Sequence, residues 1–451
     1  MKFVYKILLF VILCFFSWNY FGLLFIIAFT LYINIIHSSF CKKWYVFLLQ
    51  TFVLNFFFNL STTFWLFQVS WWEGLMAILG NSVVMQIPVF LTYLIVFKKQ
   101  KYFPYVFIVL WLIFEILHTH WSFSWPWLTL GNSMGNVYYL VQWYSVFGVY
   151  LGSLWILILG MLFSQIKCKN IKQREKIIVP VVILILPCVI SLCMYSSKQT
   201  TLEQPVQITT YLPSRNNESN FVKTKRLYSK LTGQNVEQLI VCPEVFLSSA
   251  NIYSSAQKKS NFYFDKYLNK NPKSIIVYGQ ELKSKYNLYN TIVVKKQKNT
   301  VFRVKQKFVP MREYTPTFIE KIFKVKSYYN KNKQDYTQII KKQEGFTPLV
   351  CYESIFSSFT ANLATNSNFI ILCASEEFMN GSRYGKKQYL NIVRLRAIET
   401  QKQILKCSNQ GTSCILNEKG EITKILNSEI ENIKININPK NSIYQQILNR
   451  I

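Results

Sequence analysis

Residues 348–356 read PLVCYESIF, a short apolar run that leads directly into Cys351. Two further segments place a charged residue beside an apolar run in the same way: LIVCPEVF at 239–246, and KQKFVPMREYTP at 305–316. Runs of this length are typical of strands, and residues at the carboxyl ends of neighbouring strands assemble into sites. The three segments therefore predict a layered α/β domain with one site at its strand ends.

The candidate residues in these segments are Glu244, Lys305 and Cys351, in that order along the chain. Each residue alone is weak evidence for a site. A Cys that ends a buried strand, for example, usually serves as a small hydrophobic residue. Together they form a chemically coherent set. A thiol attacks as the thiolate, a nearby ammonium favours that form, and a carboxylate can take the proton. The set predicts nucleophilic catalysis through Cys351.

The rest of the second half supports an α/β domain. From about residue 204, apolar runs of strand length recur between longer amphipathic stretches, and this alternation is typical of layered α/β folds. We expect helices at 219–233, 255–270 and 386–405. The predicted strands are 206–211, 238–242, 274–278, 290–294, 347–351, 369–373 and 412–416.

The first half is apolar enough to cross a membrane. A bilayer core of about 30 Å needs roughly 17–25 apolar residues per helix. The stretch 7–36 is too long for one span and is interrupted at 18–20 by Trp-Asn-Tyr, which predicts two short helices in a hairpin. With that hairpin we expect about seven spans. The other five apolar runs are 44–67, 74–97, 103–120, 141–165 and 177–196.

The charges predict how the chain is oriented in the membrane. Basic residues gather in alternate loops, the positive-inside pattern, which places the N-terminus in the cytoplasm. Seven crossings then deliver the chain from residue 197 onward to the far side, the periplasm of a diderm bacterium. We therefore expect a transmembrane domain over 1–197 and a periplasmic catalytic domain over 198–451.

The composition excludes several classes of protein. Residues 1–196 hold 12 Lys/Arg and 3 Asp/Glu, a net charge of +9. The remaining residues therefore carry +21 of the total net charge of +30. A chain that is 51% hydrophobic is not disordered, and ten cysteines in 451 residues are too sparse for a disulfide framework. No nucleic-acid-binding module accompanies the basic residues, so we expect them to face anionic lipid headgroups.

Two features of the membrane half leave alternatives open. Glu115 lies inside a predicted span, where a carboxylate is either a functional site or a structural hydrogen bond to a neighbouring helix. His118 follows one turn later. The loop at 121–140 is aromatic and uncharged, so Trp125 to Trp127 either form an aromatic belt at the interface or line a route for lipid.

The Glu–Lys–Cys order resembles the nitrilase, or carbon–nitrogen hydrolase, superfamily. Joined to a polytopic membrane half, it resembles the apolipoprotein N-acyltransferase family, and the similarity covers most of the chain. The matching motifs are Trp125-Pro126-Trp127-Leu128 with Gly131, Pro243-Glu244, Tyr289-Asn290-Thr291, Lys305 with Phe308-Val309-Pro310 and Glu313-Tyr314, Cys351-Tyr352-Glu353, Arg394-Leu395-Arg396-Ala397-Ile398-Glu399, and Asn409-Gln410-Gly411.

The resemblance implies a fold and an activity. The catalytic domain would be an αββα sandwich. It would move an acyl chain from a phospholipid, through a thioester on Cys351, to the N-terminal amine of diacylglyceryl-Cys apolipoproteins. Glu244 would be the base, and Lys305 would stabilise the oxyanion. The remaining motif residues, Glu313, Tyr352, Glu353 and Asn290, would support the site or bind substrate.

The expected partners follow from that chemistry. They are a phospholipid acyl donor, a diacylated apolipoprotein acceptor and the lipids of the bacterial inner membrane, and they include no nucleic acid. We expect a monomer, and we expect no cofactor. We also expect no metal, since the three histidines all lie in the membrane half. Other hypotheses are a membrane-anchored amidase that hydrolyses a small amide with the same residues, and a non-catalytic scaffold or transporter.

The chain departs from the family pattern at several places. Ser-Glu-Glu-Phe-Met at 375–379 stands where the family has N-D-A-W-F, and Met311-Arg312 replaces Phe-Gly. His118 stands where an Arg is usual, and we expect the polar residues up to Ile451 to stand where the family has its closing transmembrane helix. These departures concern the substrate pocket and lipid presentation, and they leave the Glu–Lys–Cys set intact.

Overall fold

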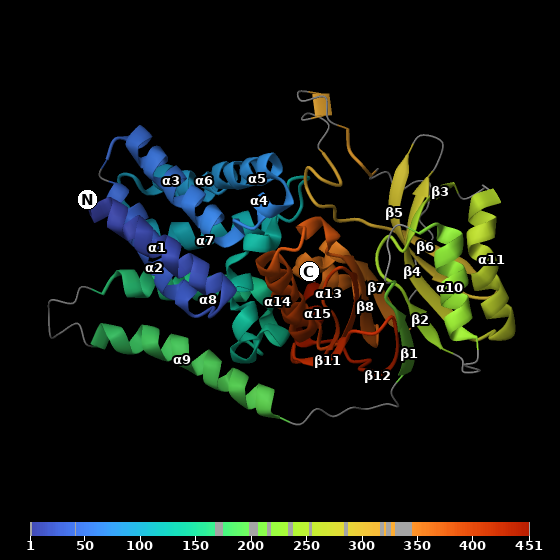
Figure 1. Ribbon diagram of the computed structural model, residues 1–451. Helices are drawn as coiled ribbons and strands as arrows, with labels where there is room; N and C mark the ends of the chain where they lie inside the picture. The colour runs from blue at the N-terminus through green and yellow to red at the C-terminus, as the bar shows by residue number, and fades with distance from the viewer. Residues whose placement is uncertain are drawn as a thin grey trace. The chain divides into compact units, whose positions relative to one another are not determined.

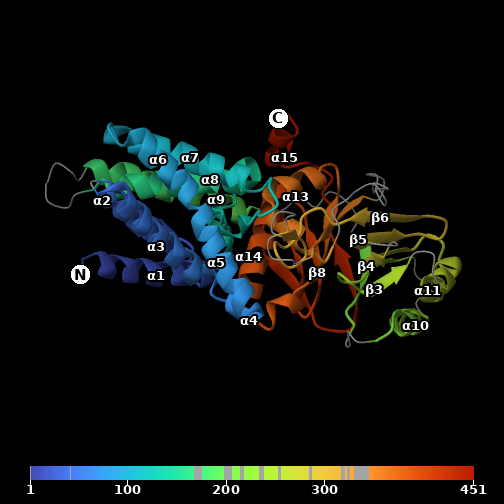
Figure 2. The same ribbon diagram turned by 90° about the horizontal axis from the view of Figure 1, so that it is seen from above.

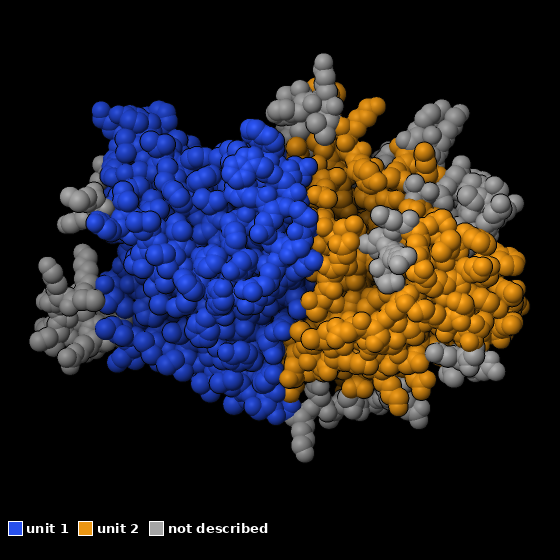
Figure 3. Space-filling model, viewed as in Figure 1, with its two compact units in different colours: residues 1–198, 379–399 blue, residues 199–378, 400–451 orange. Residues whose placement is uncertain are grey.

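Two compact units make up the chain (Figure 3). One comprises residues 1–198 and 379–399, and the other comprises residues 199–378 and 400–451. The first is helical and the second is α/β (Figure 1). The computed structural model describes residues 2–40, 42–166, 175–197, 206–213, 218–232, 238–251, 255–283, 287–315, 320–321, 326–329 and 345–450.

Apolar helices build the first unit (Figure 2). The hairpin predicted from the break at 18–20 is present as α1 (Lys2–Asn19) and α2 (Leu24–Ser39). The other helices are α3 (Trp44–Thr63), α4 (Leu66–Val69), α5 (Trp71–Val84), α6 (Gln86–Val96), η1 (Gln100–Tyr102), α7 (Phe103–Leu117), η2 (Pro126–Leu128), η3 (Leu130–Leu140), α8 (Tyr144–Ser164), α9 (Glu175–Ser196) and α14 (Arg383–Thr400).

The length and composition of these helices suit a membrane protein. Among the described residues, five helical stretches are long and apolar enough to cross a bilayer, while α1 and α2 are shorter apolar helices. The class predicted for this half is confirmed, and the count of seven spans stays a prediction. The five stretches are Trp44–Thr63, Trp71–Val96, Gln100–Leu117, Tyr144–Ser164 and Ile177–Ser196.

The segment expected as a loop at 121–140 is largely buried. It forms η2 and η3, and the indole of Trp127 is only 1% exposed, so the expectation of an interfacial belt is wrong for this residue. Gly131 allows the close packing, because a Cβ at this position would lie 2.3 Å from the carbonyl oxygen of Val149. Glu115 supports the segment by accepting a hydrogen bond from the Leu130 N–H at 2.8 Å.

Helix α14 belongs to the helical unit, although it follows the strands of the other unit in sequence. The Gln388 amide accepts hydrogen bonds from the indole N–H groups of Trp65 (3.1 Å) and Trp127 (3.0 Å). It donates to Asn19 Oδ1 (3.0 Å) and to the carbonyl of Thr62 (2.9 Å). One side chain of α14 thus satisfies polar groups from several apolar helices, which would be costly to bury unpaired.

The predicted helix over 386–405 runs too far. Helix α14 ends at Thr400, and strand β9 begins at Ile404. Gln401 has a φ of +52°, the left-handed conformation in which helices commonly end. The apolar residues after it fit the spacing of a helix, but they pair with β8 in a sheet.

The described residues of the second unit form two sheets. The order of the first is β12-β1-β2-β4-β5-β6, with β3 paired to β4, and the order of the second is β11-β10-β9-β8-β7. The strands are β1 (Val206–Tyr211), β2 (Leu239–Val241), β3 (Leu247–Asn251), β4 (Ile275–Lys283), β5 (Leu288–Lys295), β6 (Thr300–Val304), β7 (Phe346–Val350), β8 (Phe369–Ser375), β9 (Ile404–Asn409), β10 (Ser413–Leu416), β11 (Ile422–Leu426) and β12 (Ile430–Ile435).

Helices cover the first sheet on its outer side (Figure 1). α10 (Asn220–Leu231) and α11 (Ser255–Lys270) bury Leu227 and Leu268 in a core with Ile240 and Tyr278 of the sheet. Further helices along the chain after β7 are η7 (Cys351–Ile355), α13 (Ser357–Leu363), η8 (Glu377–Met379) and α15 (Ile443–Leu448). The predicted class, a helical bundle followed by an α/β domain, is confirmed.

Candidate active site

Glu244 lies just beyond β2, where the chain passes over the neighbouring strand β4. A Cβ at Gly279 would lie 2.5 Å from the Cα of Glu244, so only glycine fits beneath this turn. Asn409, at the end of β9, donates from Nδ2 to the carbonyl oxygen of Glu244 at 2.9 Å. Asn290 on β5 donates to Oε1 of the carboxylate at 2.8 Å. The first sheet therefore holds the carboxylate of Glu244, and the second sheet holds its backbone carbonyl.

Lys305 directly follows β6 and lies between two carboxylates. Its Nζ is 3.0 Å from Oε1 of Glu244 and 2.6 Å from Oε1 of Glu313. The lysine side chain is fully buried. Glu313 is itself held by the N–H of Val309, which donates to Oε2 at 2.8 Å. Glu313 therefore lies where it can keep the Lys305 ammonium charged and oriented.

Cys351 directly follows β7 and begins η7. Its φ of +39° is unfavourable for any residue other than glycine, and such strain persists only where the surrounding structure holds it. The Sγ atom lies 3.7 Å from the carbonyl oxygen of Ser375, at the end of β8. The charges of Glu244, Lys305 and Glu313 all act on the thiol. The structure therefore brings the three predicted catalytic residues together.

Burial and the neighbouring charges together set the protonation of the Cys351 thiol and the Lys305 amine. It raises the pKa of the Cys351 thiol well above its ordinary value, and Glu244 adds to this, while Lys305 acts in the opposite direction without prevailing. Burial lowers the pKa of Lys305, but Glu244 and Glu313 together outweigh it and raise that pKa above its ordinary value. The resting site therefore holds a neutral thiol beside an ammonium, so a base must take the thiol proton during attack.

Glu244 is suited to that task. Among the described residues, the donors to its carboxylate are Asn290 and Lys305, and both bind Oε1. Within the part of the chain that the structure describes, Oε2 receives no hydrogen bond. This oxygen can accept a proton without the loss of an existing contact.

Family models match both halves of the chain. The apolipoprotein N-acyltransferase N-terminal domain matches residues 8–162, and the carbon–nitrogen hydrolase domain matches residues 205–440. The chain belongs to the apolipoprotein N-acyltransferase family of carbon–nitrogen hydrolases.

Individual relatives agree with this family. An apolipoprotein N-acyltransferase of Rickettsia typhi is 23% identical over 79% of this chain and 75% of that protein. One of Haemophilus influenzae is 26% identical over 74% of this chain and 68% of that protein. Among solved structures, a carbon–nitrogen hydrolase superfamily protein of Xanthomonas campestris matches at 14% identity and a TM-score of 0.38, over 52% of this chain and 91% of that chain.

Other predicted site residues have structural partners. The Tyr352 ring is buried against Phe356, with ring centroids 5.4 Å apart. Glu353, also fully buried, forms an ion pair with Arg303. No sequence pattern singles out Arg303, because it is one of 51 basic residues. Its partner could be found only from the fold.

The segment that departs from the family at 375–379 forms a buried ion pair. Glu376 pairs with Lys406 and accepts from the Ser408 hydroxyl at 3.0 Å. The Glu376 N–H donates to the carbonyl of Asn409 at 2.9 Å, which joins the ends of β8 and β9. The altered residues therefore hold together the strand ends that carry Ser375 and Asn409 into the site.

The sequence predicts that the segment 324–346, with Tyr328 and Tyr329, is an arm that gates entry to the site, and the structure describes residues 326–329 of this arm. Tyr329 donates from its hydroxyl to Oε1 of Glu281 at 2.6 Å and from its N–H to the carbonyl of Glu313 at 2.9 Å. This piece therefore packs beside the Lys305–Glu313 pair. Residues 324–325 and 330–344 of the arm lie outside the described residues.

Glu115 and His118 form the hydrogen bonds described here with different partners. Glu115 Oε1 accepts from the Trp111 indole at 3.2 Å and from the Leu130 N–H. Trp121 Nε1 lies 2.9 Å from Nδ1 of His118, and the backbone nitrogen of Trp125 lies 3.1 Å from Nε2, and a neutral imidazole accepts a hydrogen bond at one of these two nitrogens. Both side chains thus make structural hydrogen bonds within the helical unit.

Proposed function

We propose that this protein is a phospholipid:apolipoprotein N-acyltransferase that works through a thioester on Cys351. The observation that carries the proposal is the buried ammonium of Lys305, held between Glu244 and Glu313 beside the Cys351 thiol. Membership of the apolipoprotein N-acyltransferase family supports the same conclusion.

The first half-reaction acylates the enzyme. The Cys351 sulfur attacks the ester carbonyl of a phospholipid as Glu244 takes the thiol proton. The Lys305 ammonium stabilises the negative oxygen of the tetrahedral intermediate. The ester C–O bond then breaks, the leaving oxygen takes the proton from Glu244, and a lysophospholipid departs. The acyl chain remains on sulfur as a thioester.

The second half-reaction transfers the chain to nitrogen. The N-terminal amine of a diacylglyceryl-Cys apolipoprotein attacks the thioester carbonyl, and Glu244 accepts the proton that the nitrogen loses. When the C–S bond breaks, that proton passes to the Cys351 sulfur. The products are an amide and the regenerated thiol, so the cycle needs no cofactor or metal.

The membrane half has a physical role in this reaction. Both substrates are lipids, and moving an acyl chain into water costs about 0.8 kcal/mol per CH₂ group. In this proposal, residues 1–197 form a multi-pass domain in the bacterial inner membrane, and residues 198–451 form a catalytic domain on the periplasmic side. The protein acts as a monomer. The alternation of basic and uncharged loops supports this orientation.

The test is the complete reaction in a purified system. The full-length protein in detergent micelles receives a phosphatidylethanolamine and a synthetic diacylated lipopeptide, and mass spectrometry follows the lipopeptide. We expect a mass increase of one acyl chain with the wild type and none with Cys351→Ala. Release of free fatty acid or ammonia without acylation of the lipopeptide would instead favour the amidase alternative.

A further inference from the structure

The Glu353 carboxylate is saturated with hydrogen bonds. Oε1 accepts from Arg303 Nη1 at 2.9 Å and from the Gln306 N–H at 2.8 Å. Oε2 accepts from Arg303 Nη2 at 2.6 Å and from the Val350 N–H at 2.9 Å. A carboxylate offers about four lone-pair sites. Glu353 is therefore already fully engaged, and it neither takes a proton nor binds a substrate amine.

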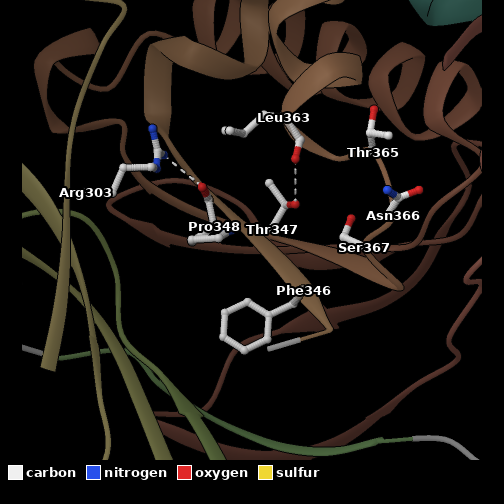
Figure 4. A pocket seen from close by; sticks show the side chains of 8 residues that line it. All are labelled: Arg303, Phe346, Thr347, Pro348, Leu363, Thr365, Asn366 and Ser367. Atoms are coloured by element: carbon white, nitrogen blue, oxygen red, sulfur yellow. Dashed lines mark hydrogen bonds between the residues drawn. The ribbon is translucent and has the colours of Figure 1, made fainter. Parts of the chain in front are cut away.

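Arg303 joins the two sheets of the α/β unit. It lies on β6 of the first sheet, and its Nη2 also donates to the carbonyl of Pro348 on β7 of the second sheet at 2.8 Å (Figure 4). Figure 4 shows the guanidinium at one end of a pocket lined further by Thr347 and Leu363. The Arg303 and Glu353 side chains are 9% and 0% exposed. A forked, buried pair of this kind fixes both distance and orientation.

The backbone contacts of this pair lie next to the reactive residues. The Gln306 N–H follows Lys305 in sequence, and the Val350 N–H precedes Cys351. The Val350 contact also closes the turn in which Cys351 adopts its left-handed conformation. The pair thus touches both sides of the site at positions adjacent to the ammonium and the thiol.

We propose that Arg303 is a positioning residue for catalysis: with Glu353 it forms a clamp between the two sheets that sets Lys305 relative to Cys351. This inference rests on the proposed function, because its readout is the acylation of Cys351. The clamp acts on the rate of attack and leaves lipid binding unaffected, since the carboxylate of Glu353 and both Nη atoms of Arg303 are already engaged with each other and with the backbone. Lysine cannot replace Arg303, because an ammonium does not form the fork.

The experiment measures thioester formation on Cys351 in the full-length protein. Arg303→Lys in detergent micelles is mixed with increasing amounts of phosphatidylethanolamine, quenched with acid, and followed by intact-protein mass. The acylation rate at saturating lipid is expected to fall by about 10²-fold, the cost of a misplacement of about 1 Å. The half-saturating lipid concentration is expected to stay unchanged.

A matched control and a second variant accompany this measurement. Arg226→Lys changes another arginine–glutamate pair of the same unit, 2.6 Å from Glu218 but with side chains 30% and 16% exposed, and should acylate at the wild-type rate. The double variant Arg303→Gln/Glu353→Gln removes both charges, so neither is left buried without its partner. It should also be slow, and it replaces Arg303→Lys if that variant does not fold.

The outcomes separate the clamp from the proposed function. A folded variant with a lowered rate and unchanged half-saturation supports the clamp. A wild-type rate in Arg303→Lys or in the double variant overturns it, and so does a loss that appears only as weaker lipid binding. If the wild-type protein itself forms no thioester, the proposed function fails.

Discussion

The Nζ atom of Lys305 lies 3.0 Å from Oε1 of Glu244, and both side chains are buried. Isolated charges are expensive in such a place, and each of these groups offsets the burial cost of the other. The same pair stands beside a thiol whose pKa is raised. Proton removal by the carboxylate and charge stabilisation by the ammonium can therefore occur together at one reacting carbon.

Replacing Glu244 by Gln should remove the base and keep the shape of the site. Because the amide cannot take the thiol proton, acylation of Cys351 should slow by about 10²–10⁴-fold. Single-turnover thioester formation, followed by intact-protein mass, measures this directly. Glu429→Gln, which alters a partly exposed pair with Lys230, serves as control. A Glu244→Gln enzyme as fast as that control would refute the assignment of the base.

The raised pKa of the Cys351 thiol predicts a pH dependence. A thiol whose pKa lies above its ordinary value of about 8.5 is protonated at neutral pH, so its thiolate fraction keeps growing as the pH rises past that value. Alkylation of Cys351 by iodoacetamide without lipid should therefore accelerate continuously from pH 6 to beyond about pH 8.5. Peptide mass spectrometry quantifies the modified residue. A plateau reached below pH 7 would show a preformed thiolate instead.

Adding a methyl group at Gly279 should displace the base. The new Cβ of Gly279→Ala would lie 2.5 Å from the Cα of Glu244, so one of the two backbones must move. We expect acylation to slow by about 10²-fold, as for other small misplacements of a reacting group. Gly80→Ala, whose Cβ meets no atom within 4 Å, is the matched control. Equal rates in the two variants would mean that Glu244 tolerates the shift.

Gln388→Leu should destabilise the helical unit. The change leaves the indoles of Trp65 and Trp127 without their acceptor, and each unsatisfied buried group costs about 1–3 kcal/mol. Thermal unfolding in detergent should show a lower midpoint than for the wild type. Gln446→Leu, at an exposed position in α15, should leave the midpoint unchanged. No difference between the two variants would argue against α14 as a stabilising part of this unit.

The parts of the site that could be predicted are those marked by local sequence. Glu244, Lys305 and Cys351 each stand at the end of an apolar run, and the ends of strands are where sites assemble in such folds, here with β2 and β6 from one sheet and β7 from the other. The hairpin of α1 and α2 was predictable for a similar reason, because polar residues interrupt an apolar stretch that is too long for one helix.

The parts that could not be predicted depend on long-range packing. The amphipathic pattern of α14 shows that one face is buried, but it does not show that Gln388 meets the indoles of Trp65 and Trp127. Trp127 illustrates the same limit, since an aromatic residue suits both a lipid interface and a protein interior. The pairing of Arg303 with Glu353 joins residues 50 positions apart on different sheets, and no local sequence pattern indicates this pairing.

The central claim is that Cys351 carries the acyl chain between the two substrates. Its most direct test is the intact mass of the full-length protein after incubation with phosphatidylethanolamine alone, followed by addition of a diacylated lipopeptide. We predict a mass increase of one acyl chain, located on Cys351 by peptide analysis, that disappears as the lipopeptide gains the same mass. An adduct on another residue, or a Cys351 adduct that the lipopeptide does not remove, would contradict this account.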